Sequence, residues 1–104
     1  MSDHVLILST ASTRAEADTI AETLVAEKLA ACVHLSAVDS VYRWQGEVEH
    51  SAEIRLSIKT RADLAGPIEA RIKALHSYDV PEIVVVPIAG GSADYLAWIG
   101  ECIV

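Results

Sequence analysis

The most constraining feature of this sequence is a long stretch of strict alternation between apolar and polar residues, from Glu47 to Lys59. Its even positions carry apolar side chains, except for His50, and its odd positions carry only Glu, Ser, Arg and Lys. Because successive side chains of a β-strand point to opposite faces, the pattern predicts one uninterrupted strand with an apolar face and a polar face.

Such a strand is too long for the domain that contains it. About twelve residues in a strand span about 40 Å, whereas a compact domain of this size measures only about 35 Å across. Strand-forming residues at 32–42 and a turn at 44–47, where Gly46 can adopt a positive φ, predict that the strand belongs to a hairpin. We expect the hairpin to project beyond its own core and to need another copy of the chain as cover.

Two main helices are predicted, one on each side of the hairpin in the sequence. Thr13 followed by Glu16 matches a capping box, in which each side chain binds the other's backbone amide. Thr60 is predicted to cap the second helix, and Gly66-Pro67 to kink it or to delay its regular part. The first apolar face is Ala17, Ile20, Ala21, Leu24 and Val25, and the second is Leu64, Ile68, Ile72 and Leu75.

Two short apolar runs and a last helix complete the pattern. Residues 5–8 and 82–88 are predicted to be buried strands, with a loop at 76–81 before the second one. Ser92 is predicted to cap a short helix that carries Tyr95, Trp98 and Ile99. The order β-α-β-β-α-β plus a helix predicts an α+β, ferredoxin-like sandwich, with one domain over residues 1–104.

The net charge, the cysteine content and the N-terminal sequence indicate the expected partners and cellular location. A net charge of −7 disfavours binding to nucleic acid or to an anionic membrane surface. Cys32 and Cys102 are too few for a disulfide framework, and the apolar run at 5–8 is too short for a signal peptide or a membrane span. We therefore expect a cytoplasmic protein with reduced thiols.

Cys32 and His34 are the candidate metal ligands. They are two residues apart on a predicted strand, so they share a face. A thiolate and an imidazole suit copper or zinc, although a structural zinc site needs four ligands. The alternative is that Cys32 is a small core residue and His34 a hydrogen-bonded polar neighbour.

His76, Tyr78 and Glu82 form a second candidate group, with Glu53 and Lys59 as possible neighbours. A loop that precedes a strand is a common position for binding residues, and a histidine beside a carboxylate can hold a cation or a polar ligand. The alternative is a loop held in place by side-chain hydrogen bonds and an ion pair.

The aromatic residues of the hairpin and the absence of nucleotide motifs narrow the function further. Tyr42 and Trp44 share a face, and we interpret them as anchors of a subunit interface rather than as a stacking site for a planar ligand. The chain has no Walker A or GxGxxG pattern and no Asn, so neither an organic cofactor nor an acylphosphatase-like reaction is expected.

Five segments carry a resemblance to a known family. In order they are Ala31-Cys32-Val33-His34, Ser40-Val41-Tyr42-Arg43-Trp44-Gln45-Gly46, Glu53 with Lys59-Thr60, His76-Ser77-Tyr78-Asp79-Val80-Pro81-Glu82-Ile83, and Tyr95-Leu96-Ala97-Trp98. In this order and spacing they resemble the CutA divalent-cation tolerance family over nearly the whole chain. Two positions depart from the family pattern, since His34 replaces a usual Asn and Ser77 a usual Pro.

The resemblance implies a homotrimer whose hairpins pair between subunits, as in PII-like signalling proteins, and a link to copper and other divalent cations. A closed trimer would bring the 76–82 loop of one subunit beside the Glu53–Lys59 strand of another, which predicts a ligand cleft between subunits. The expected function is binding in divalent-metal tolerance, without catalysis. One alternative is a PII-like metabolite sensor, but the short hairpin turn lacks the long docking loop of such sensors. The other is a purely structural, very stable trimer without a ligand.

Overall fold

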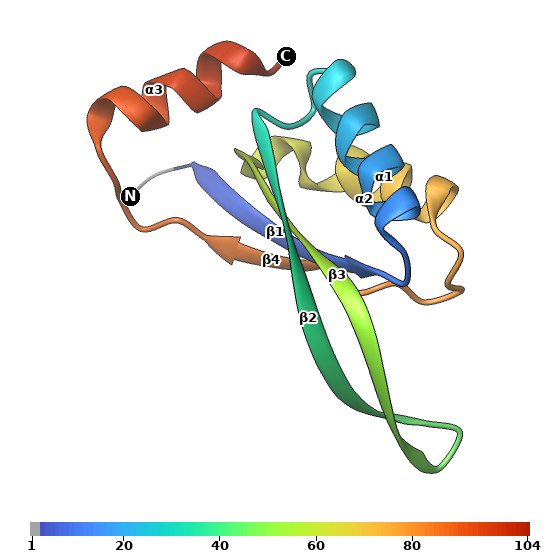
Figure 1. The fold of residues 1–104 in the computed structure, drawn as a ribbon. Helices are drawn as coiled ribbons and strands as arrows, with labels where there is room; N and C mark the ends of the chain where they lie inside the picture. Colours follow the sequence, from blue (N-terminus) through green and yellow to red (C-terminus); the bar gives the residue numbers. More distant parts are fainter. Residues whose placement is uncertain (1–2) are drawn as a thin grey trace.

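The computed structural model describes residues 3–104 and contains one four-stranded sheet with helices (Figure 1). The sheet order is β2-β3-β1-β4 and each neighbouring pair is antiparallel, so the predicted α+β ferredoxin-like arrangement is confirmed. The elements are β1 (His4–Ala11), α1 (Arg14–Ala26), β2 (Cys32–Trp44), β3 (Glu47–Arg61), the 3-10 turn η1 (Ala62–Leu64), α2 (Ala65–Leu75), β4 (Val84–Pro87) and α3 (Ala93–Cys102).

The β2–β3 hairpin projects from the body of the molecule, as the alternating pattern predicted (Figure 1). Gln45 and Gly46 form its two-residue turn with φ values of 50° and 82°, the positive values that a type I′ hairpin requires. β1 pairs with β3 only over residues 54–61, so residues 47–53 pair with β2 alone. The molecule is consequently elongated, 44 Å along its longest axis.

One face of the sheet holds the core. α1 and α2 cover this face (Figure 1), and the side chains between them are aliphatic. Burying each large aliphatic side chain contributes about 2 kcal/mol, so this layer provides much of the driving force for folding. Its fully buried members include Ile7, Ile20, Leu24, Leu56, Ile58, Ile68 and Ile72.

The opposite face of the sheet, called here the open face, has no helix layer over most of its area. Residues paired across neighbouring strands point to the same side, so the register assigns its members. They include Leu6, Leu8, Cys32, His34, Glu53, Arg55, Ser57, Lys59, Val84 and Val86. Because it mixes apolar and charged side chains, the open face differs from the aliphatic core layer.

Two local predictions are wrong and one is confirmed. Thr60 does not cap a helix, because it lies within β3 and its hydroxyl donates to the Leu29 carbonyl at 2.6 Å. The predicted delay at Gly66-Pro67 is confirmed, because the regular helix starts at Ala65 and Pro67 falls in its first turn, where no backbone donor is needed. Val25 is not part of the buried face of α1, since it is 43% exposed.

The last strand is also shorter than predicted. β4 comprises Val84–Pro87 rather than 82–88, because only these residues pair with β1. Ser92 caps α3 as predicted, with its hydroxyl accepting from the Tyr95 amide at 3.2 Å. Within residues 3–104, no helix has the length and apolar character needed to cross a membrane.

Candidate functional site

Glu53 lies at the base of the hairpin, where β3 extends past the end of β1. The last residue of β1, Ala11, pairs with Ile54, so Glu53 is the first residue of the projecting part. Glu53 is only 9% exposed, although it belongs to the polar row of the alternating pattern. The Tyr78 hydroxyl donates to its Oε2 at 2.9 Å. The structure thus brings together Glu53 and Tyr78 of the same chain.

His76 anchors the loop that delivers Tyr78. Its side chain is 0% exposed. Its Nε2 lies 2.6 Å from the Thr10 carbonyl, and its Nδ1 lies 3.0 Å from the Tyr78 amide nitrogen. A carbonyl only accepts and an amide N–H only donates, so the proton of a neutral imidazole is on Nε2. Both ring nitrogens are therefore occupied within the chain.

Glu16 holds the same loop from the start of α1. Its carboxylate accepts from the Ser77 amide at 2.8 Å and from the Ser77 hydroxyl, and its Oε1 lies 3.2 Å from Nδ1 of His76. Thr13 caps α1 as predicted, by accepting from the Glu16 amide at 3.2 Å. The reciprocal half of the predicted capping box is wrong, because the Glu16 carboxylate binds the loop instead.

Tyr78 remains a neutral hydrogen-bond donor over a wide pH range. Desolvation, followed by the hydrogen bond and the negative charge of Glu53, raises the pKa of Tyr78 to about 12. The His76 and Tyr78 rings are in contact, with centroids 4.7 Å apart. Tyr42 lies near the same site, since its hydroxyl accepts from Ser51, two residues before Glu53, at 3.2 Å.

Lys59 and Glu82 are not joined to this group within one chain. Lys59 is six residues from Glu53, or about 20 Å along the strand. Its ammonium donates to the Tyr95 hydroxyl at 2.9 Å and lies 4.8 Å from the centroid of that ring. Glu82 is exposed in the segment before β4, and no contact to Glu53 or Tyr78 brings it into the group.

The two candidate metal ligands lie on the open face at the start of β2. Cys32 is half-buried opposite Lys59, and His34 is exposed opposite Ser57. No cluster of three or more His, Cys, Asp or Glu side chains suited to a metal occurs within residues 3–104. A metal bound by Cys32 and His34 would need further ligands from another copy or from water.

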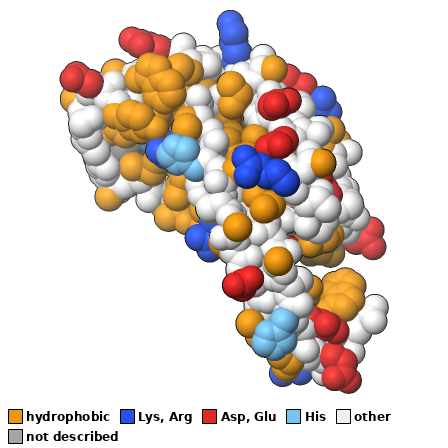
Figure 2. All heavy atoms as spheres, in the orientation of Figure 1, with side chains coloured by type: hydrophobic (Ala, Val, Ile, Leu, Met, Phe, Trp, Pro, Cys, Tyr) orange, Lys and Arg blue, Asp and Glu red, His pale blue; other side chains and the backbone are white. Residues whose placement is uncertain are grey.

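The hairpin aromatics are exposed in the single chain. Tyr42 is 43% exposed and Trp44 is 57% exposed, on the same side of the ribbon as Glu53. Figure 2 shows hydrophobic side chains gathered over α3 and again on the hairpin. The hairpin aromatics therefore have the exposure that interface anchors need, although their role stays a prediction.

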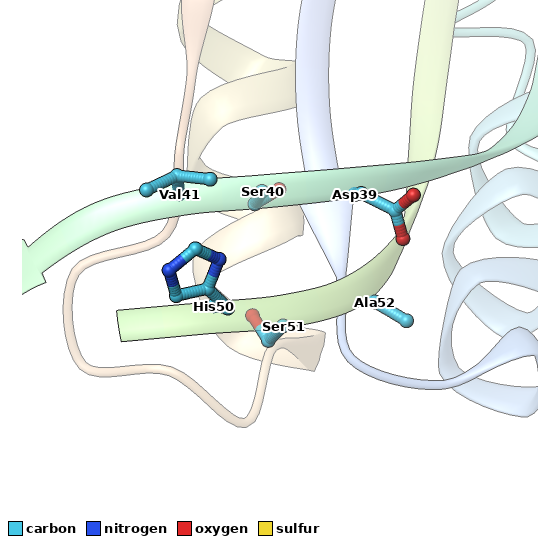
Figure 3. A pocket seen from close by; sticks show the side chains of 6 residues that line it. All are labelled: Asp39, Ser40, Val41, His50, Ser51 and Ala52. Atoms are coloured by element: carbon cyan, nitrogen blue, oxygen red, sulfur yellow. The ribbon is translucent and has the colours of Figure 1, made fainter. Parts of the chain in front are cut away.

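A hollow on the hairpin was not anticipated from the sequence. Asp39 and His50, on adjacent strands, are the two potential cation ligands in it (Figure 3). His50 was the only polar exception in the apolar row, which was the available signal. The lining is Asp39, Ser40, Val41, His50, Ser51 and Ala52.

The fold and this geometry define a small α+β protein with an open sheet face and a projecting hairpin. Comparison with known proteins makes the assignment specific, because residues 5–102 match the family model of the CutA1 divalent ion tolerance protein. The divalent-cation tolerance protein CutA of Thermus thermophilus is 46% identical over 97 residues, which are 92% of this chain and 94% of that protein. The chain belongs to the CutA1 divalent ion tolerance family.

Two further relatives show how widely this domain is distributed. The chloroplastic protein CutA of Arabidopsis thaliana is 42% identical over 96 residues, which are 91% of this chain and 53% of that protein. The solved structure of the periplasmic divalent cation tolerance protein CutA from Archaeoglobus fulgidus has a TM-score of 0.93 at 37% identity, covering 95% of this chain and 97% of that one. The names of these relatives state cation tolerance or the family and state no reaction.

Proposed function

We propose that this protein is a homotrimer that acts in divalent metal tolerance by binding metal ions, copper above all, or a small ligand at clefts between subunits. The observation that carries the proposal is the combination of an open sheet face with a hairpin that has no partner beyond its own two strands. The family description, a divalent ion tolerance protein, supports the metal function.

Assembly as a trimer is supported by the edges that the chain leaves unpaired. β4 pairs with β1 on one side only, and Val84, Val85 and Val86 are all at least 38% exposed. A neighbouring hairpin could extend this edge and cover these side chains. A cyclic arrangement satisfies every copy equivalently, which an open chain of copies does not.

Copper or zinc would be held by the Cys32 thiolate and the His34 imidazole. These ligands suit both metals, and their position on the open face lets a neighbouring copy or water complete the coordination. The Glu53–Tyr78–His76 group is the proposed ligand cleft, with Lys59 and Glu82 as contributions from a neighbour. We propose binding rather than catalysis and a cytoplasmic location, although relatives include chloroplastic and periplasmic proteins.

Metal titration of the wild type and of Cys32→Ser tests this function. Native mass spectrometry with copper or zinc should show metal bound to a trimer, and calorimetry should show at least about a tenfold loss of affinity in Cys32→Ser. Binding should weaken as the pH falls, because protons compete for both ligands. Unchanged binding in Cys32→Ser would move the metal site elsewhere.

A PII-like metabolite sensor is the second candidate. It is favoured because PII-like proteins share the trimeric layout with ligand clefts that is expected for this chain. It is disfavoured by the two-residue turn of the hairpin, which leaves no docking loop. The same mass spectrometry separates the two, because a metabolite sensor would retain a small organic molecule and show no response to copper or zinc.

A further inference from the structure

The carboxylate of Glu53 belongs to a buried residue and forms no ion pair within residues 3–104. Its residue is 9% exposed, and its Oε2 accepts from the neutral Tyr78 hydroxyl. Within residues 3–104, the ion pairs closer than 4.0 Å join other side chains, and none includes Glu53. A carboxylate removed from water is costly unless a cation or several donors compensate it. Its Oε1 has no hydrogen-bond partner within residues 3–104 and keeps some access to solvent, so a cation from outside the chain can reach it.

The groups around Glu53 accept hydrogen bonds and present aromatic rings. Tyr78 offers its phenol oxygen and ring, and Tyr42 is held nearby through Ser51. The negative charge of Glu53 and the proximity of Tyr42 both act to raise the pKa of Tyr78, which places these three groups in one neighbourhood. A carboxylate next to aromatic rings is a suitable environment for an organic cation.

We propose that Glu53 receives an ammonium or guanidinium group from outside the chain. This inference rests on the proposed ligand cleft and names the chemical class of its ligand. Such a group would donate to the free oxygen of Glu53 and to the phenol oxygen of Tyr78, while its positive charge contacts the ring.

A metal ion fits this position less well. The pKa of Tyr78 is raised in the metal-free protein, so a metal ion would have to displace the phenol proton before it could bind this oxygen. The nitrogens of His76 are both occupied, by the Thr10 carbonyl and the Tyr78 amide. Glu53 is then the only charged ligand at the position, whereas hard cations need several oxygen ligands.

The cationic group can come from two sources. One is a free amine or guanidine compound. The other is a lysine or arginine of a second copy, and Arg55, exposed on the open face and outside the ion pairs among residues 3–104, is such a side chain. The chemistry at Glu53 is the same in both cases.

Calorimetry with n-butylammonium and ethylguanidinium tests the free-ligand source, with n-butanol as the uncharged probe. Glu53→Gln removes the charge but keeps an oxygen that can accept from Tyr78. Glu49→Gln is the matched control, since it removes a carboxylate from the same strand and the same side, but at an exposed position. Glu53→Gln should weaken binding of the cations at least about tenfold, and Glu49→Gln should leave it within about twofold.

Sedimentation of the same variants tests the second source. If the wild type binds neither cation and Glu53→Gln alone shifts the protein towards smaller species, a neighbouring copy supplies the group. The proposal is overturned if the cations bind Glu53→Gln as well as the wild type, or if Glu53→Gln changes neither binding nor assembly.

A measurement on the wild type covers the case in which Glu53→Gln does not fold. If the ligand is a free cation, the ¹³C resonance of the Glu53 side-chain carboxyl should move on addition of n-butylammonium or ethylguanidinium, and not on addition of n-butanol. If a second copy supplies the cation, the resonance should move when dilution dissociates the copies. A resonance that moves in neither case contradicts the proposal. The metal function is tested separately by copper titration of Glu53→Gln. This titration reports on Cys32 and His34, which lie at the other end of the strand pair.

Discussion

At the scale of single residues, the bond between Tyr78 and Glu53 connects a loop to the base of the hairpin. The two residues are 25 positions apart in the sequence and 2.9 Å apart at their oxygens. The bond keeps Tyr78 protonated, because burial and the adjacent carboxylate both oppose formation of a second negative charge. Tyr78 therefore stabilises the buried carboxylate as a donor.

The first prediction at this scale concerns alkaline pH. The pKa of Tyr78 is raised from its ordinary value of 10 to about 12 in the folded state. The stability that this shift represents is fully present below about pH 10 and is lost as the pH rises through about 12. Thermal melts between pH 9 and pH 12 should show this loss in the wild type and a smaller one in Tyr78→Phe.

At neutral pH, Tyr78→Phe should be less stable than the wild type by about 1–2 kcal/mol, because a buried carboxylate loses its donor. Absorbance at 295 nm provides a direct check, since the difference between the two titration curves isolates Tyr78. If that difference rises near pH 10, the phenol is not desolvated as described.

The residues of this site differ in how far the sequence could predict them. The sequence predicted His76, Tyr78 and Glu82 as a group, with Glu53 and Lys59 as possible neighbours. Of these five, the structure joins His76, Tyr78 and Glu53 within one chain. The sequence could not reveal that Glu53 is buried, because its cover comes from a loop distant in sequence and its own row is polar. The role of Glu16 was missed for the same reason, since its partner Ser77 is 61 residues away.

At the scale of elements, His76 joins β1, α1 and the loop before β4. Its imidazole binds the Thr10 carbonyl and the Tyr78 amide, and it lies beside Glu16. Ser77 adds two donors to Glu16, its backbone amide and its hydroxyl. A proline at this position would offer neither donor.

The prediction at this scale is that His76→Ala loosens the loop. The substitution leaves a buried carbonyl and an amide without partners and opens a cavity, so the free energy of unfolding should fall by about 2–4 kcal/mol. Denaturant unfolding measures this change. Glu82→Gln is the control, because an exposed substitution in the same segment should change stability by less than about 0.5 kcal/mol. Equal losses in both variants would show that His76 is not the anchor.

Element boundaries were predicted best where a local signal sets them. The alternating stretch, the Thr13 and Ser92 caps and the Gln45-Gly46 turn all depend on neighbours within a few residues. Thr60 misled the prediction because its hydroxyl matches a cap, whereas pairing with β1 extends β3 to Arg61. β4 is short because its pairing with β1 begins only at Val84 and ends at Pro87, with one further backbone hydrogen bond from Ile88 to His4. No local sequence pattern encodes where this pairing begins.

At the scale of the whole molecule, the single chain leaves two surfaces uncovered, the open face of the sheet and the projecting hairpin. Helices cover one face of the sheet, while the open face and the hairpin remain uncovered in the single copy (Figure 1). The exposed apolar side chains lie mainly on β4, α3 and the hairpin, with Trp44 at 57% and Val84 at 47%. A trimer that buries these surfaces would also form the clefts in which metal or ligand sites are proposed.

A matched pair of substitutions tests this assembly. Val84 on β4 and Val25 on α1 have nearly equal exposure in the single chain, 47% and 43%, but only Val84 lies on the open face. Val84→Lys should raise the dissociation constant of the trimer at least about a hundredfold, because it removes an apolar contact and buries an unpaired charge. Val25→Lys adds the same charge to the helix layer and should leave the trimer intact.

Trp44→Ala should weaken assembly by about 2 kcal/mol or more if Trp44 is an interface anchor. Sedimentation velocity at micromolar concentration measures all four proteins, and a wild type that sediments as a stable monomer would refute the trimer. Assembly that Val25→Lys and Val84→Lys weaken equally would show that overall charge, rather than burial of the open face, controls association.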